Sequence, residues 1–218
     1  MNPRFIIRLS VILFVLLAGS ATRADPVSWL VTVNTTSLQG TGGYVNFQFN
    51  PGGAGAQPAT VTIGNFTAPD ATLAPVVERL GAVTGTAPGT VTLQNSAQLN
   101  DYFQGMTFGN GFSFTLTLSG LAIDAPGGNV GSAFALALFG ADQLTPLLTL
   151  DPNGSLLTLF VNTTGTITTL TFPAGASAAS VITLQQQGTA VPEPGALALL
   201  GTGILGMAAA RRRKPVAT

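Results

Sequence analysis

The stretch FSFTLTL at residues 112–118 alternates apolar and polar side chains without a break. Successive side chains of a β-strand point to opposite faces of its sheet, so this pattern predicts a strand with one buried and one solvent-facing side. The same alternation recurs at residues 27–33, 45–49, 61–63, 91–93, 167–172 and 181–184. A period of two repeated along the chain predicts an all-β protein.

Residues 132–139 differ, because large side chains at Phe134, Leu136 and Leu138 alternate with alanines. A strand that is apolar on both sides is expected in the middle of a sheet. Glycine and proline clusters separate the apolar stretches, at residues 40–43, 50–58, 125–128 and 173–176. We therefore predict an antiparallel β-sandwich, jelly-roll-like, with about nine to eleven strands.

Three local features add detail to this fold. Residues 74–80 and, as a second candidate, 97–106 are the stretches in which short helices are expected, although neither has a strong apolar stripe. The sequence Asp-Pro-Asn-Gly at 151–154 has the chemistry of a type I turn, and we expect it to join strands at 147–150 and 156–161.

The first residues of the chain have the pattern of a secretory signal peptide. Arg4 and Arg8 precede an apolar run at 9–18, and Thr22 and Ala24 occupy the small-residue positions of a cleavage site. We therefore expect residues 1–24 to direct export and to be removed by signal peptidase. No twin-arginine pair is present, which favours the Sec-type export machinery.

The last stretch, VPEPGALALLGTGILGMAAARRRK at 191–214, joins three features in a fixed order. Proline fixes φ and lacks an N–H, so Pro192, Glu193 and Pro194 stay extended and accessible. Residues 195–210 carry no charge and as a helix would span about 24 Å of a hydrocarbon core of about 30 Å. Cations follow as a stop-transfer signal, namely Arg211, Arg212, Arg213 and Lys214. This charge predicts that 215–218 form a short cytoplasmic end and that 25–190 lie outside.

This tripartite order resembles the PEP-CTERM sorting signal of bacterial exported proteins. The resemblance implies recognition by an exosortase, a membrane-embedded transpeptidase-like protease. The alternative is an ordinary tail anchor, which has no need for the Pro-Glu-Pro triplet and usually runs nearer about 20 apolar residues. More loosely, residues 42–52 and 100–103 are similar to a group of PEP-CTERM proteins with uncharacterised all-β ectodomains, which implies export and a β fold but no activity.

The predicted domain at 25–190 has an unusual charge composition. It contains seven carboxylates and a single cation, Arg79, which gives a formal net charge of −6, although the whole chain has a net charge of 0. Without a basic patch, we expect no binding to nucleic acid. The chain has no cysteine and no histidine, which excludes disulfides, thiol nucleophiles and the usual Ser-His-Asp arrangement.

Within the apolar segment, residues 201–206 fit the dinucleotide pattern G-x-G-x-x-G. That fingerprint requires a preceding strand and a later acidic residue, so we reject it here. The small residues at steps of four instead suggest a helix-packing face, with tolerance for small side chains as the alternative. This face consists of Ala198, Thr202, Gly206 and Ala210.

The remaining candidates lie in the domain. Most carboxylates adjoin glycine, proline or asparagine, where they are expected to cap turns, and no calcium-loop spacing is present. We expect no catalytic residue, no metal centre and no cofactor. Trp29 shares the parity of apolar neighbours and should lie in the core, whereas Tyr44 shares the parity of Asn46 and Gln48 and is the candidate ligand contact.

These observations lead to a non-enzymatic exported protein. We expect it to be anchored first in the inner membrane, with the domain outside the cytoplasm, and then to reach the cell surface or the extracellular matrix. Its expected partners are the exosortase, the export machinery, signal peptidase, the membrane and extracellular polysaccharide. One alternative is a carbohydrate-binding module or adhesin of the exopolysaccharide matrix, with or without calcium, and another is a carboxylate glycosidase.

Overall fold

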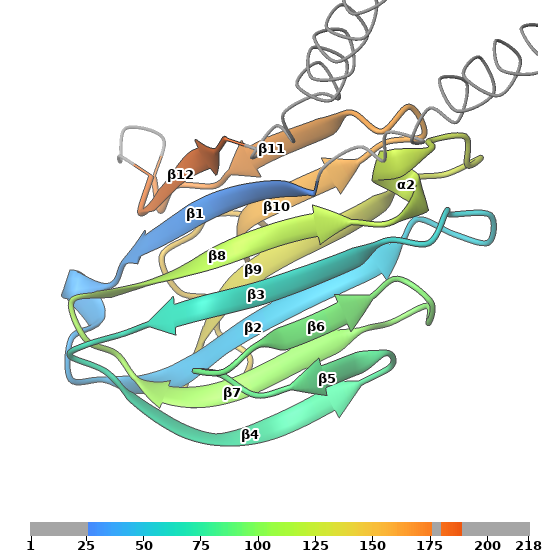
Figure 1. Ribbon diagram of the computed structural model, residues 1–218. Helices are drawn as coiled ribbons and strands as arrows, with labels where there is room; N and C mark the ends of the chain where they lie inside the picture. Colours follow the sequence, from blue (N-terminus) through green and yellow to red (C-terminus); the bar gives the residue numbers. More distant parts are fainter. Residues whose placement is uncertain (1–25, 176–179, 189–218) are drawn as a thin grey trace, which may run out of the picture.

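The computed structural model describes residues 26–175 and 180–188, which form two antiparallel six-stranded sheets packed face to face (Figure 1). The strands of the first sheet, in spatial order, are β12 (Ile182–Gln187), β1 (Val27–Asn34), β8 (Gly111–Ser119), β3 (Thr60–Thr67), β6 (Val91–Gln94) and β5 (Val83–Gly85). Those of the second sheet are β11 (Ile167–Thr171), β10 (Ser155–Val161), β9 (Ser132–Gly140), β2 (Gly42–Pro51), β7 (Asp101–Thr107) and β4 (Thr72–Leu80). The prediction of an all-β sandwich is confirmed.

The chain passes from one sheet to the other at most of its connections, as it does in jelly-roll folds. The hydrophobic core lies between the sheets. In β8 the burial of side chains alternates strictly along the strand, and β8 pairs with β1 on one side and β3 on the other. The strand that carries the clearest sequence pattern therefore lies inside its sheet, between two paired neighbours.

Aromatic side chains join the two sheets. The ring of Phe47 on β2 meets the ring of Phe114 on β8 edge-on, with centroids 5.3 Å apart. Phe47 also lies 6.3 Å from Phe134 on the neighbouring strand β9. Trp29 is 7% exposed, in the core as its parity predicts. Because packed aromatic rings bury large apolar areas, these contacts contribute strongly to the stability of the sandwich.

Several local predictions are wrong. The strands β4 and β7 form where short helices were expected at 74–80 and 97–106, and the described residues form twelve strands in all. The turn at 151–154 does form, with the N–H of Gly154 donating to the carbonyl of Asp151 at 2.9 Å. Residues 147–150 are nevertheless not a strand, and β10 pairs with β9 and β11 instead.

Helical structure is limited to η1 (Thr36–Leu38) and α2 (Leu121–Asp124) within the described residues. In that part of the chain, no helix is long and apolar enough to cross a membrane. The expected signal peptide at 1–24 and the expected sorting signal at 191–214, including its span at 195–210, lie outside the described residues.

The strand register places the start of the first strand, β1, beside the end of the last strand, β12. Ser28 of β1 pairs with Gln187 of β12, and Val27 pairs with Leu118 at the end of β8. The loop from β2 to β3 lies at this same end, because Thr60 at the start of β3 pairs with Ser119. Tyr44, near the start of β2, lies toward the opposite end.

Asn100 is fully buried and ties three segments of the main chain together. Its amide Nδ2 donates to the carbonyls of Phe49 (2.9 Å) and Ala97 (2.7 Å), and its Oδ1 accepts from the N–H of Ala82 (2.9 Å). We expect Asn100→Ala to lower the free energy of unfolding by about 2–4 kcal/mol, because main-chain groups lose their partners. Urea unfolding followed by Trp29 fluorescence measures this change.

Asn110→Ala is the matched control, since the exposed Asn110 side chain makes one hydrogen bond, to Asp70 at 3.0 Å. Its effect should stay within about 0.5 kcal/mol. Equal effects of the two substitutions would show that Asn100 has no special structural role.

Candidate functional site

The outer face of the second sheet carries a group of aromatic and polar side chains around Tyr44. Outer here means the face that points away from the first sheet. We call this group the Tyr44 site. It consists of Tyr44, Asn46, Gln48, Glu78, Asp101, Phe103, Phe139 and Gln143. The strand register explains the gathering, because Tyr44 pairs with Phe139, Asn46 with Phe103, and Gln48 with Asp101.

Three aromatic rings from adjacent strands form one side of the site. Tyr44 stacks on Phe103 with ring centroids 4.9 Å apart and an angle of 10° between the ring planes. Phe103 lies 5.8 Å from Phe139 at an angle of 50°. A Cβ atom at Gly105 would lie 3.1 Å from Ala74 and 3.5 Å from the ring of Tyr44, so glycine leaves room for that ring. The three rings present a mainly apolar platform at the surface.

Polar groups line a shallow depression of about 230 Å³ beside the rings. Asn46 is buried, and its amide Nδ2 donates to the carbonyl of Tyr102 at 3.2 Å and to Oδ1 of Asp101. Among the described residues, the second carboxylate oxygen of Asp101 has no side-chain hydrogen-bond donor. Glu78 on the edge strand β4 pairs with Phe103 and so points to the same face. The depression thus holds two carboxylates side by side.

The environment shifts the ionisation of Asp101. Burial raises the pKa of its carboxyl above the ordinary value of 3.8, and the negative charge of Glu78 adds to this rise, while the hydrogen bond from Asn46 opposes it. Burial disfavours the charged form of an acid, and a neighbouring like charge does the same. The folded protein therefore holds this proton more tightly than the unfolded chain does.

A short loop after β9 brings Gln143 to the site. The carboxylate of Asp142 accepts hydrogen bonds from the N–H groups of Leu144 (3.1 Å) and Thr145 (3.0 Å) and from the Thr145 hydroxyl (2.5 Å). These donors lower the pKa of Asp142 to about 2, the side-chain hydrogen bond from Thr145 first among them. Gln143 has a positive φ of 62°, and its Nε2 donates to the hydroxyl of Tyr44 at 3.2 Å.

The other candidates from the sequence have structural roles. Asp151 accepts from the N–H of Ser155 at 2.9 Å and Asp142 holds its own loop, as expected for acids that cap turns. Tyr102 is fully buried, and its hydroxyl accepts from the N–H of Ala87 at 2.9 Å and donates to Gln104. Within residues 26–175 and 180–188, no group of three or more potential metal-ligating acids forms.

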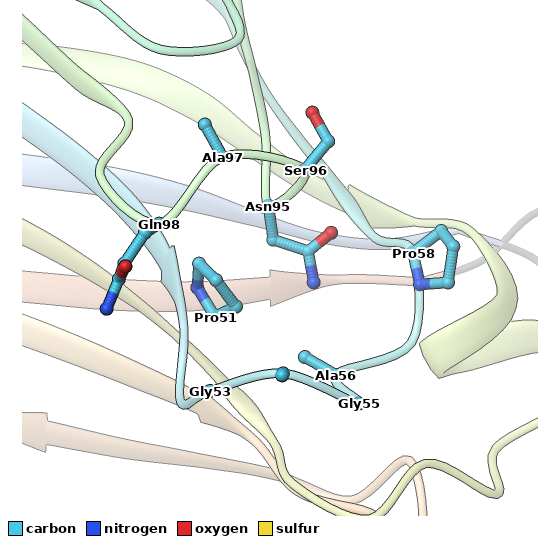
Figure 2. Close-up of a pocket in the computed structure, with 10 residues that line it drawn as sticks. Pro51, Gly53, Gly55, Ala56, Pro58, Asn95, Ser96, Ala97 and Gln98 are labelled. Carbon is cyan, nitrogen blue, oxygen red and sulfur yellow. The ribbon is translucent and has the colours of Figure 1, made fainter.

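A second hollow lies between the β2–β3 loop and the β6–β7 loop, with a volume of about 460 Å³. Figure 2 shows residues 95–98 on one loop and Gly53, Gly55 and Ala56 on the other, with the side chain of Asn95 directed toward the second loop. The side-chain amide of Asn95 already makes three hydrogen bonds within the protein. Its Oδ1 accepts from the N–H of Ala59 (2.8 Å), and its Nδ2 donates to the carbonyl of Gln57 (2.8 Å) and to the hydroxyl of Ser132 (2.7 Å). The lining carries neither an aromatic ring nor a charge, which makes this hollow the weaker candidate.

The sequence identified Tyr44 but missed most of its neighbours. Asn46 and Gln48 lie on the same strand as Tyr44 with the same parity, and this alternation was the sequence signal that could have added them to the site. Phe103 and Asp101 fall in the stretch at 97–106 that was expected to be helical. The alternation of faces that applies to a strand therefore did not place them on the side of Tyr44. The ligand contact of Tyr44 stays a prediction. Four further predictions lie outside the described residues: the motif at 192–194, the cations at 211–214, the span at 195–210 and its packing face.

We expect Glu78→Gln to lower the pKa of Asp101, because the substitution removes a like charge beside it. Carboxyl carbon NMR resolves the titration of Asp101 directly. Asp70→Asn, an acid outside the site, is the control and should leave that titration in place. An unchanged Asp101 pKa in Glu78→Gln would mean that the two carboxylates do not face one depression.

The same shift has a consequence for stability. Because the folded state binds the Asp101 proton more tightly, the free energy of unfolding contains a contribution that falls as pH rises from 3.8 to the raised folded pKa. Asp101→Asn should remove that fall, which pH-dependent urea unfolding measures. A fall of the same size in the variant would assign it to other groups.

Comparisons with known proteins bear on the end of the chain. A protein-family comparison matches residues 190–214 to the PEP-CTERM protein-sorting motif. Comparisons with curated proteins and with solved structures found no match. The matched residues include the Pro-Glu-Pro triplet, the uncharged segment and the cations. The chain therefore carries a PEP-CTERM sorting motif, which marks it as an exported protein that an exosortase sorts at the membrane.

Proposed function

We propose that this chain is a non-enzymatic protein of the cell surface or extracellular matrix, delivered by its signal peptide and processed by an exosortase near Pro192–Pro194. The observation that carries this proposal is the sorting motif at 190–214, which follows the β-sandwich in the chain. The last strand, β12, ends at Gln187, close to the first proline of the motif. The sandwich is therefore joined almost directly to its sorting signal.

The short connection limits where the domain sits before processing. From Gln187 to Gly195, where the uncharged segment begins, an extended chain reaches about 30 Å at most. The sandwich stays that close to the bilayer until the motif is cut. Its net negative charge repels anionic headgroups, which favours release from the surface once the anchor is removed.

The chemistry of the domain supports a role without catalysis. The chain lacks histidine and cysteine, and Arg79, the one cation in the described residues, donates to the carbonyl of Gly85 at 2.8 Å and to Thr86. Its guanidinium also lies 5.9 Å from the ring centroid of the buried Tyr102. Nucleophilic and metal-dependent chemistry thus has few candidate groups, and only Asp101 and Glu78 bring two carboxylates to one depression.

Intact mass spectrometry of the exported protein tests this processing. We expect a chain that begins near Asp25 and lacks Arg211–Lys214, because the cut falls near the Pro-Glu-Pro triplet. Glu193→Ala should leave the unprocessed, membrane-bound chain, whereas Gln187→Ala, just outside the motif, should be processed as the wild type is. A mature form that still contains Arg211–Lys214 would contradict the proposal.

A second candidate function is carbohydrate binding as an adhesin of the extracellular polysaccharide. The observation that favours it is the Tyr44 site, where an accessible aromatic platform adjoins amides and carboxylates. Co-sedimentation of the full-length protein with the purified matrix polysaccharide of the producing bacterium tests it. Retention in the pellet with an intact polysaccharide is the expected result. Shortening of the polysaccharide would instead favour a carboxylate glycosidase. A polysaccharide pellet that contains none of the protein would exclude carbohydrate binding.

A further inference from the structure

The Tyr44 site has the chemistry to select one class of glycan. We propose that it binds a neutral polysaccharide, with Tyr44, Phe103 and Phe139 as the stacking platform and Asp101 and Glu78 as acceptors for sugar hydroxyls. This inference rests on the carbohydrate-binding function proposed above and names its ligand class and its residues.

The rings provide the apolar half of recognition. The face of an aromatic ring carries negative partial charge, and the C–H groups on one side of a pyranose ring carry positive partial charge, so the two pack together. Tyr44 and Phe139 are half-buried and keep part of their ring area accessible, while Phe103 between them is 9% exposed. Phe103 supports the platform and the two flanking rings present its contact area.

The carboxylates provide the polar half. An ionised carboxylate accepts hydrogen bonds only, and each of its oxygens can receive a sugar hydroxyl. Asn46 holds one oxygen of Asp101 in place and is itself fixed by the carbonyl of Tyr102 at 3.2 Å. The acceptor is therefore oriented before any ligand arrives, which reduces the entropy lost on binding. The amide of Gln48 lies beside it in register.

Charge decides between neutral and acidic glycans. Asp101 and Glu78 both point into the depression, and no cation lines it. Arg79 follows Glu78 in the strand and is engaged elsewhere, with Gly85, Thr86 and the ring of Tyr102. Uronic acid or sulfated sugars would bring like charges into contact with these carboxylates, which disfavours binding. A neutral chain meets no such penalty.

The shape of the face fits a chain that crosses the strands. A path across the face covers four adjacent strands, β9, β2, β7 and β4, which is three interstrand spacings or about 14 Å. Phe139 lies on the first of these strands and Glu78 on the last. Small side chains border this path on β9, where Ala135 and Ala137 lie beside Gln48 and Asn46. A short segment of polysaccharide can therefore lie flat across the face.

Isothermal titration calorimetry of the full-length protein, in a detergent without a sugar headgroup, tests this inference. The neutral probes are hydroxyethyl cellulose, dextran and galactomannan, and the acidic probe is alginate, all at low ionic strength where repulsion is least screened. We expect binding to at least one neutral probe and none to alginate. Preference for alginate would overturn the ligand class.

Substitutions locate the site. Tyr44→Ala and Asp101→Asn should each weaken neutral-glycan binding by about tenfold or more, because one removes a stacking ring and the other a charged acceptor. Phe160→Ala is the matched control: Phe160 is 43% exposed on β10, in the same sheet but outside the site, and its loss should change affinity by less than about twofold. Glu78→Gln, on the exposed edge strand, provides a further variant that should fold and bind more weakly.

The outcomes separate this inference from the function on which it rests. Neutral-glycan binding that Tyr44→Ala, Asp101→Asn and Glu78→Gln leave unchanged would place the ligand elsewhere, and carbohydrate binding would stand. Co-sedimentation with the matrix polysaccharide without binding to any neutral probe would overturn the ligand class alone. Failure of both assays would overturn the binding function together with its site.

Discussion

The packing of Phe47 against Phe114 across the sandwich, with ring centroids 5.3 Å apart, is the contact on which much of the rest depends. A strand shows alternate residues to opposite faces, so the inward placement of Val45, Phe47 and Phe49 forces Tyr44, Asn46 and Gln48 outward. A register slip of one residue would bury the polar set and expose the core set. The hydrophobic core thus determines which side chains the second sheet presents to its surroundings.

The sequence was sufficient for strands whose two faces differ clearly. In β8, and in β1 from Trp29 onward, every second residue is apolar and buried, and the period of two was unambiguous. The same signal was absent in β4, an edge strand with largely exposed side chains and register shifts near Val76. It was also hidden in β7, where the inward residues include Gln104, whose buried amide donates to the carbonyl of Ala74 at 3.0 Å. A polar residue on the inner face removes the contrast that reveals a strand.

The site itself depends on contacts that a sequence pattern does not contain. Asn46 and Asp101 meet only because β2 and β7 pair in one particular register, although 55 positions separate them in the chain. Turn chemistry, by contrast, is local, and it correctly predicted the main-chain bond between Asp151 and Gly154. Asp101 departs from the turn-capping role expected of the acids because it begins a strand and points to the sheet surface. Long-range register therefore turned an ordinary surface acid into part of a site.

The position of Gln187 distinguishes the Tyr44 site from the hollow between the β2–β3 and β6–β7 loops. Gln187 and Ser28 lie at one end of the sandwich, and the chain beyond Gln187 reaches the uncharged segment within about 30 Å. The loops that line the hollow between β2–β3 and β6–β7 lie at this same end, from which the chain continues into the sorting motif. Tyr44 lies about 23 Å from Pro51 along β2, toward the opposite end of the sandwich and on the outer face of the second sheet. The same register that builds the Tyr44 site thus also places it toward the end of the sandwich opposite Gln187, the last strand residue before the sorting motif.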